Sequence, residues 1–245
     1  MSRRRIAVLL AAVLAVSATT MWAVFFALEA EPAARAVAES DGRPCRDPCA
    51  FTFGPEAAPV GLILYPGAGV EPAAYAPLAA AVADHGFLVT IQRAPLDLAV
   101  LDADMAQAAI DAHPGIDTWA VGGHSLGGAM AARFAAGSDD VAGLVLLAAY
   151  PEEALDLSQS DLAVLSISAS GDPLVTPADI LASAAQLPDD TVFVEVVGGN
   201  HAQFGSYGRQ LRDAPASIDP EEQRRITVEA IDDLLSSLGS QPGES

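Results

Sequence analysis

The sequence predicts an α/β domain with a mostly parallel, doubly wound sheet and helices on both faces. From residue 50 onward, short apolar runs alternate with helix-like segments, and this alternation is typical of strand–helix–strand units. The runs are continuous rather than alternating, as in strands buried on both faces. Residues 50–240 are long enough to bury a sizeable core and contain no visible repeat, so we expect one domain there.

Six apolar runs predict the strands: Val60–Tyr65, Phe87–Ile91, Thr118–Gly122, Val141–Ala148, Leu162–Ser168 and Thr191–Val197. Helices are expected between and after them, at Pro72–Asp84, Leu98–Ala112 and Ser125–Ala136, and from Thr176 and Asp219 onward. The last two starts combine a capping residue, a first-turn proline and an early acid. The final helix carries one apolar stripe, Ile226, Ala230, Ile231, Leu234, Leu235 and Leu238.

The N-terminal residues 1–28 predict a transmembrane or signal helix ahead of this domain. Three arginines, at 3–5, precede the uncharged stretch Ile6–Leu28, which as a helix spans about 34 Å and could cross a bilayer core. That length favours an uncleaved anchor, while the alanine content and the small-x-small sites at 34–36 and 36–38 leave a cleaved signal open. The arginines place the rest of the chain outside the cytoplasm, either tethered to the cell membrane or secreted.

Residues 29–49 are expected to be a linker, because Pro, Glu, Ala and Ser occur there without periodicity. The chain has only two cysteines, Cys45 and Cys49. In an exported protein a disulfide between them is favoured over free thiols. A metal site would need further ligands, and no histidine is near in sequence.

The charge balance excludes several functions. With 32 acidic against 12 basic residues the net charge is −20. Nucleic-acid binding needs a basic surface, and so does docking on anionic lipid. We expect no nucleic-acid partner, and contact with a membrane only through the N-terminal helix.

The run Gly123-His124-Ser125-Leu126-Gly127 follows a predicted strand and opens a predicted helix. It matches Gly-x-Ser-x-Gly, in which a serine sits on a sharp strand-to-helix turn with its hydroxyl exposed. The flanking glycines relieve crowding at such a turn. Ser125 is therefore the candidate nucleophile, and the Leu126 amide at the helix start is a candidate oxyanion donor.

A serine nucleophile needs a base, and His201 is the best of the four histidines. His85 and His113 read as solvated helix ends, and His124 adjoins the nucleophile, where its side chain should point elsewhere. His201 follows the predicted strand that ends at Val197. In parallel sheets ligands bind beyond the carboxyl ends of the strands, which is where this position falls.

An acid should hold the base, and Asp172 lies between serine and histidine in chain order, just after a predicted strand. Its Gly-Asp-Pro context is also ordinary turn chemistry. Asp161 would begin a strand at the wrong end of the sheet, and Asp179 reads as a first-turn helix acid. The second oxyanion donor is expected in the loop after the strand ending at Tyr65, from the Ala68 amide first and Gly69 next.

Four motifs carry a resemblance: Gly-His-Ser-Leu-Gly at 123–127, Tyr-Pro-Gly at 65–67, Gly-Asp-Pro-Leu-Val-Thr-Pro at 171–177 and Gly-Gly-Asn-His-Ala-Gln-Phe-Gly at 198–205. Together they resemble the α/β-hydrolase superfamily, and most closely its small, lidless, dienelactone-hydrolase-like branch. The resemblance spans about residues 58–238. Dienelactone hydrolases proper use cysteine where this chain has Ser125. The resemblance implies an α/β-hydrolase fold and a serine hydrolase acting on a small-molecule ester or related acyl bond. It implies no cofactor and no metal.

Two other functions stay open at this point, a catalytically silent binding scaffold outside the cytoplasm and hydrolysis of membrane lipids. The interval between Ala148 and Leu162 is too short for a cap domain, so the site should be open or covered by small loops. Phe204 and Tyr207, close to His201 in sequence, are candidates for a pocket wall or for core packing.

Overall fold

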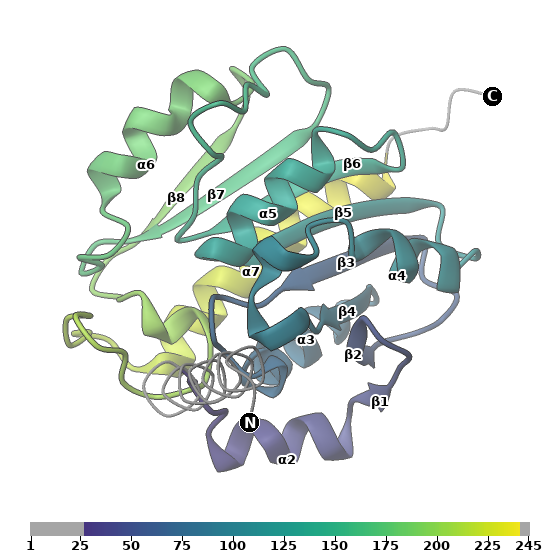
Figure 1. The fold of residues 1–245 in the computed structure, drawn as a ribbon, viewed down its shortest axis with the longest axis horizontal. Coiled ribbons are helices and arrows are strands. Elements are labelled where there is room, and N and C mark those ends of the chain that lie inside the picture. Colours follow the sequence, from purple (N-terminus) through teal and green to yellow (C-terminus); the bar gives the residue numbers. More distant parts are fainter. Residues whose placement is uncertain (1–26, 241–245) are drawn as a thin grey trace, which may run out of the picture.

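The computed structural model describes residues 27–240 and contains one eight-stranded sheet between two layers of helices (Figure 1). The strand order is β1-β2-β4-β3-β5-β6-β7-β8. Strands β3 to β8 pair in parallel, and β1 and β2 run antiparallel at one edge. The predicted α/β class and mostly parallel sheet are therefore confirmed, whereas most of the predicted N-terminal helix, residues 1–26, lies outside the described residues.

All six predicted strands are present with ends shifted by at most two residues: β3 (Val60–Tyr65), β4 (Leu88–Gln92), β5 (Thr118–His124), β6 (Val141–Leu147), β7 (Ala163–Ala169) and β8 (Val192–Val196). Every residue of β3 and β4 is buried. This explains why their sequences read as continuous apolar runs. Among the strands of residues 27–240, only β8, the last strand of the sheet, exposes large apolar side chains.

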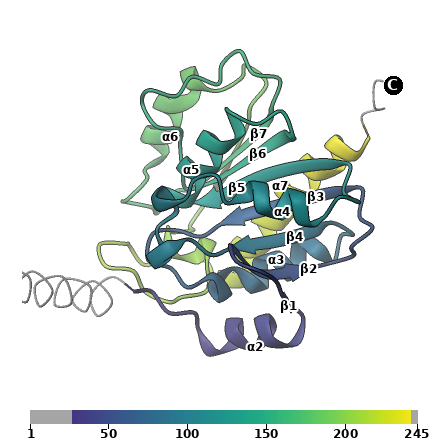
Figure 2. The same ribbon diagram turned by 45° about the vertical axis from the view of Figure 1, so that its right-hand side comes forward.

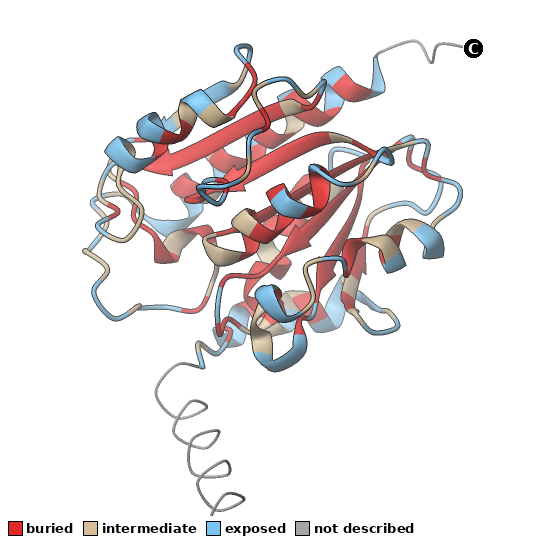
Figure 3. Cartoon of the chain, turned by 45° about the horizontal axis from the view of Figure 1, so that its top comes forward, coloured by how far each residue is buried: buried red, intermediate tan, exposed pale blue. Residues whose placement is uncertain are grey.

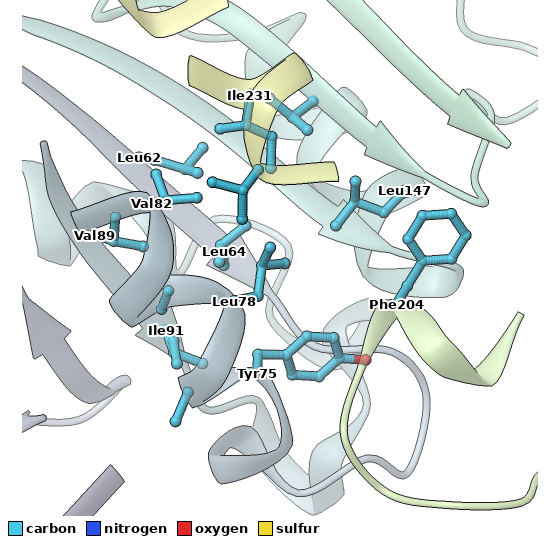
Figure 4. Packing of buried hydrophobic residues seen from close by; sticks show 14 of the residues in the cluster. Leu62, Leu64, Tyr75, Leu78, Val82, Val89, Ile91, Leu147, Phe204 and Ile231 are labelled. Carbon is cyan, nitrogen blue, oxygen red and sulfur yellow. The ribbon is translucent and has the colours of Figure 1, made fainter. Parts of the chain in front are cut away.

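Two apolar cores cover the two faces of the sheet, and burial is concentrated in the strands (Figure 3). One face packs against α3 (Ala76–Ala83), which follows the 3-10 turn η1 (Pro72–Tyr75), and against α7 (Pro220–Gly239). In Figure 4, Leu78 and Val82 of α3 and Ile231 of α7 lie over strand residues such as Leu62 and Leu64. The other face packs against α4 (Ala106–Ala112) and α5 (Leu126–Ala135).

The helix predicted from Leu98 begins only at Ala106, so this expectation is corrected. The buried Tyr65 hydroxyl donates to the Ala103 carbonyl (2.8 Å) and accepts from the Ala106 amide (3.0 Å), which fixes the start of α4. Upstream lie two short 3-10 turns, η2 (Pro95–Asp97) and η3 (Ala99–Leu101). The predicted caps of the last two helices are present at α6 (Pro177–Ser183) and α7.

Residues 29–49 differ from the predicted linker, since they contain α2 (Pro32–Ser40), β1 (Arg43–Pro44) and the start of β2 (Cys49–Phe53). Ala34 and Ala38, one turn apart on α2, are buried, and the helix lies beside α3 (Figure 2). Both small-x-small sites fall inside α2, so cleavage there would cut an integrated helix. The favoured Cys45–Cys49 disulfide is formed. Between residues 27 and 240, no helix is both long and apolar enough to span a bilayer.

Candidate functional site

Ser125 lies on the turn between β5 and α5, in an unusual backbone conformation. Its φ is 53° and its ψ −124°, a region that residues other than glycine rarely occupy and that costs of order 1–3 kcal/mol. The Ser125 amide donates to the Leu147 carbonyl at the end of β6 (2.9 Å), which holds the turn at the carboxyl ends of the parallel strands. The predicted strand–turn–helix context of the serine is present.

Glycine is required on both sides of this turn. A Cβ on Gly123 would meet the Gly127 carbonyl carbon at 2.5 Å. A Cβ on Gly127 would meet the Pro66 and Tyr65 carbonyl oxygens at 2.3 and 2.4 Å. The close approach at Gly127 brings the start of α5 against the loop that follows β3, so both predicted oxyanion donors lie on neighbouring backbone.

The structure brings Asp172 and His201 together in a buried hydrogen bond. Asp172 Oδ2 lies 2.6 Å from His201 Nδ1, and both side chains are almost fully inaccessible to solvent. The other carboxylate oxygen accepts from the amides of Leu174 (2.7 Å) and Val175 (2.9 Å). Since both oxygens have partners, the carboxylate is fixed with one oxygen aimed at the imidazole.

Backbone contacts tie the two loops that carry this pair. The Gly171 amide donates to the Gly199 carbonyl (2.9 Å), and the Gly198 amide donates to the Ser170 hydroxyl (2.8 Å). Asp172 follows β7 and His201 follows β8, which are neighbouring parallel strands. Their separation is therefore set by strand pairing and by the contacts between the loops.

The loop that carries His201 is held by two side chains, Gln223 and Asp213, that the sequence patterns did not identify. Gln223 of α7 is fully buried; its Oε1 accepts from the Asn200 amide (3.0 Å) and its Nε2 donates to the Asn200 carbonyl (2.9 Å). The Asp213 carboxylate accepts from the amides of His201 (3.4 Å) and Ala202 (2.8 Å). The loop is thus clamped directly before and after the imidazole.

The loop after β3 has three consecutive amides, of which two are occupied. The Gly67 amide donates to the Tyr75 hydroxyl (2.9 Å), and the Gly69 amide donates to the Asp97 carbonyl (2.8 Å). Between them, the amide of the exposed Ala68 makes no hydrogen bond to any residue from 27 to 240. Of the two predicted alternatives, only Ala68 has its donor free for a ligand.

His124 does not point away from the site, as the sequence suggested, but packs beneath His201. The two ring centroids are 4.5 Å apart. His124 Nδ1 lies 2.8 Å from the Tyr75 hydroxyl. The same hydroxyl accepts from the Gly67 amide, and its proton is available to donate to His124 Nδ1.

Burial keeps the side chains of His124 and Tyr75 neutral. Burial first, and the neighbouring imidazole of His201 second, hold the pKa of His124 well below its ordinary value. Burial also raises the pKa of the Tyr75 phenol above its ordinary value. His124 Nε2 is buried without a partner among the described residues. A neutral ring therefore lies against the candidate base.

The remaining predictions concern two aromatic residues, the other histidines and the Ser125 hydroxyl, and their outcomes differ. Phe204 and Tyr207 are both buried in the core around His124, so they serve as packing rather than as an exposed wall. His85 contacts Asp232 and His113 contacts Glu56, and neither has a contact with His201 or Asp172 among the described residues. Over residues 27–240 the Ser125 hydroxyl makes no hydrogen bond, so its contact with His201 stays a prediction.

Comparisons with known proteins bear on the fold. A family model described as "Alpha/beta hydrolase family" matches residues 61–225. No curated protein sequence matches the chain. A solved structure of a predicted CIB-like hydrolase from Thermoplasma acidophilum superimposes with a TM-score of 0.59 at 17% identity, over 75% of this chain and 92% of that one.

Esterase 2 from Thermogutta terrifontis is also similar. With butyrate bound it gives a TM-score of 0.53 at 17% identity, covering 80% of this chain and 91% of that one. Its form phosphorylated by paraoxon gives 0.54 at 19% identity, covering 77% and 88%. At these identities the likeness concerns the fold.

Proposed function

Because the chain belongs to the alpha/beta hydrolase family, we propose that it is a serine hydrolase that cleaves a carboxylic ester through an acyl-enzyme. The supporting observation is the buried pair of Asp172 and His201 at the same sheet edge as the strained turn of Ser125. Burying a carboxylate and an imidazole costs folding free energy, which favours a functional role for the pair. The pair also lies at the carboxyl ends of the strands, where parallel sheets bind ligands.

In the proposed reaction the Ser125 hydroxyl attacks the ester carbonyl while His201 Nε2 takes its proton. Asp172 Oδ2 accepts the Nδ1–H of His201, which fixes the tautomer and stabilises the imidazolium that forms. The imidazolium then protonates the leaving alcohol. Water, activated by the same imidazole, hydrolyses the acyl-enzyme and regenerates Ser125. No cofactor takes part in these reaction steps.

The oxyanion of each tetrahedral intermediate would be held by the Leu126 and Ala68 amides. Leu126 is the first residue of α5, where helix amides lack internal partners and the helix dipole favours negative charge. Ala68 has the free amide of the adjoining loop. Removing one such donor typically costs about 10²–10³ in kcat.

Active-site phosphylation tests the proposal. Folded full-length protein is incubated with a fluorophosphonate probe or with paraoxon, and the labelled peptide is identified by mass spectrometry. We expect one label per chain, on Ser125, and none in Ser125→Ala. Hydrolysis of p-nitrophenyl esters of graded chain length then measures activity and acyl preference.

A matched pair of acids tests the role of Asp172. Asp172→Asn should lower kcat by roughly 10³–10⁴-fold, because the imidazole loses its tautomeric control. Asp179→Asn alters an exposed helix cap and should leave kcat near wild type. If folded protein is not labelled and equals Ser125→Ala in every ester assay, the chain is instead a silent binding scaffold, the alternative function.

A further inference from the structure

The uncharged segment Ile6–Leu28 ends directly at the rim of the proposed site. Leu28 pairs with Val70 as an isolated parallel bridge. Its amide donates to the Gly69 carbonyl (2.7 Å), and its carbonyl accepts from the Glu71 amide (2.9 Å). Gly69 adjoins Ala68, the free donor of the loop. No spacer therefore separates the apolar segment from residues 66–69, the loop that carries the proposed oxyanion donor Ala68 and is called the oxyanion loop below.

The next residues are fixed along the same rim. The Ala30 amide donates to the Glu71 carboxylate (2.9 Å), which also pairs with Arg35 of α2 (2.7 Å). The Glu31 amide donates to the Ser206 carbonyl, in the segment that follows His201 (2.8 Å). Residues 28–31 thus run between the oxyanion loop and the segment after the candidate base, and hydrogen bonds to both hold the point at which the chain enters the domain.

On the other side of the oxyanion loop, a short segment exposes three large apolar side chains. Leu96, Val100 and Leu101 are 66%, 49% and 54% exposed. The segment is joined to the loop by the Asp97 carbonyl, which accepts from the Gly69 amide, and η3 packs against α5. Leu96 has a φ of 54°, which leucine rarely adopts. Leucine is thus kept in a strained backbone conformation while its side chain lies exposed to solvent.

Taken together, these features lead us to propose that the site opens onto a lipid bilayer and takes long-chain acyl esters from it, an inference that rests on the proposed serine-hydrolase function. The 23 uncharged residues of Ile6–Leu28 match the thickness of a bilayer core. Anchored there, Leu28 lies at the interface with Gly69 and Val70 beside it. Leu96, Val100 and Leu101 then reach into the acyl region, which extends the membrane contact beyond the N-terminal helix, the only contact expected from the sequence. The net charge of −20 favours a neutral, zwitterionic surface.

The position of the anchor can be tested by separating it from the domain. Full-length protein is reconstituted in dioleoylphosphatidylcholine vesicles containing dioleoylglycerol, and oleate release is measured alongside hydrolysis of soluble p-nitrophenyl butyrate. A flexible Gly/Ser spacer of about twelve residues between Ala27 and Leu28 adds a reach of roughly 20 Å. We expect it to lower oleate release about tenfold, because the effective concentration of bilayer ester at the site falls. The rate on p-nitrophenyl butyrate should not change.

The apolar rim can be tested with a matched surface variant. Leu96→Asp combined with Leu101→Asp should lower the ratio of oleate release to butyrate hydrolysis about tenfold, since the rim no longer enters the acyl region. Aspartate tolerates positive φ better than leucine, so the fold should persist. Val192→Asp is the control: Val192 is also 54% exposed, but it begins β8, at the opposite edge of the sheet.

The results separate this inference from the function beneath it. If wild type hydrolyses the soluble ester but not the vesicle ester, or if the spacer and rim variants release oleate as fast as wild type, the bilayer inference is overturned and the hydrolase stands. If neither ester is cleaved and Ser125 is not labelled, the proposed serine-hydrolase function itself is overturned.

Discussion

The Tyr75 hydroxyl lies 2.8 Å from Nδ1 of His124, and the same oxygen accepts the Gly67 amide at 2.9 Å. One buried side chain thus links the oxyanion loop to a neutral ring that packs against His201. The free Ala68 amide follows Gly67 directly. The orientation of the proposed oxyanion donor, Ala68, and the position of the candidate base, His201, therefore depend in part on these two hydrogen bonds.

Tyr75→Phe should impair both the orientation of the Ala68 amide and the position of His201. It leaves a buried amide and a buried imidazole nitrogen without partners, at a cost of about 1–3 kcal/mol in the free energy of unfolding. We also expect kcat to fall roughly 10- to 100-fold with a smaller change in KM, because alignment rather than binding is lost. Urea denaturation and p-nitrophenyl ester kinetics measure the two effects.

Tyr65→Phe is the matched control for this variant. The Tyr65 hydroxyl also bridges two backbone groups, the Ala103 carbonyl and the Ala106 amide, but on the opposite face of the sheet. It should cost similar stability with a much smaller loss of kcat. Equal losses of kcat in the two variants would mean that Tyr75 contributes only to folding.

His124 should make the protein less stable in acid. Its pKa in the folded protein is held below the ordinary value by burial and by His201, while in the unfolded chain it titrates near 6.5. Above about pH 6.5 both states are neutral and the group contributes nothing. Below that pH the unfolded state alone takes up a proton, so stability falls by up to about 1.4 kcal/mol per pH unit until the folded pKa is reached.

His124→Asn should reduce this dependence, since the amide oxygen can still accept from Tyr75 but does not titrate. The measurement is the free energy of unfolding of both proteins by urea at about pH 7.5 and about pH 5. The advantage of wild type over the variant should be smaller at the lower pH. An unchanged difference would show that His124 is not kept neutral by the fold.

Sequence patterns predicted the sheet and the proposed triad because these features are local. A buried strand reads as an apolar run, and the turn at Ser125 requires glycines at 123 and 127. Asp172 and His201 could be placed because each directly follows a strand, and parallel pairing of β7 and β8 brings them together. The Gly-x-Ser-x-Gly pattern also indicated the Leu126 amide, since Leu126 opens the helix that follows the turn.

The remaining features depend on contacts distant in sequence. Nothing local in residues 29–49 shows that two alanines of α2 are buried, or that Tyr65 delays the start of α4 by hydrogen bonding across the sheet. Tyr75 and His124 meet across 49 positions. Gln223 did leave a signal: it lies four and eight residues before Thr227 and Ile231, on the buried side of the last helix, where a polar side chain needs a buried partner.

Gly127→Ala should inactivate the protein, whereas the same substitution at Gly137, just past the end of α5, should not. A methyl group at 127 would lie 2.3 Å from the Pro66 carbonyl oxygen, so α5 and the oxyanion loop must move apart. We expect destabilisation of about 1–3 kcal/mol and a loss of at least roughly 100-fold in kcat. Gly137→Ala, just past the end of α5, places its methyl 3.8 Å from the nearest heavy atom and should leave activity unchanged. Activity in both variants would place the oxyanion donors elsewhere.

Gln223→Met tests whether the clamp on the His201 loop affects catalysis. Methionine has a similar shape but leaves the buried amide and carbonyl of Asn200 without partners, which should cost about 2–3 kcal/mol. As His201 loosens, kcat should fall with KM nearly constant, and the downfield proton resonance of its Nδ1–H should broaden or disappear.

Thr227→Val is the control on the same face of α7, because the Thr227 hydroxyl bonds only to the carbonyl of Gln223 within its own helix. It should keep kcat and the Nδ1–H resonance. A Gln223→Met protein that loses stability but keeps both would restrict Gln223 to folding. Loss of the resonance in step with kcat would instead show that Gln223 of α7 holds the candidate base, His201, in register with Asp172.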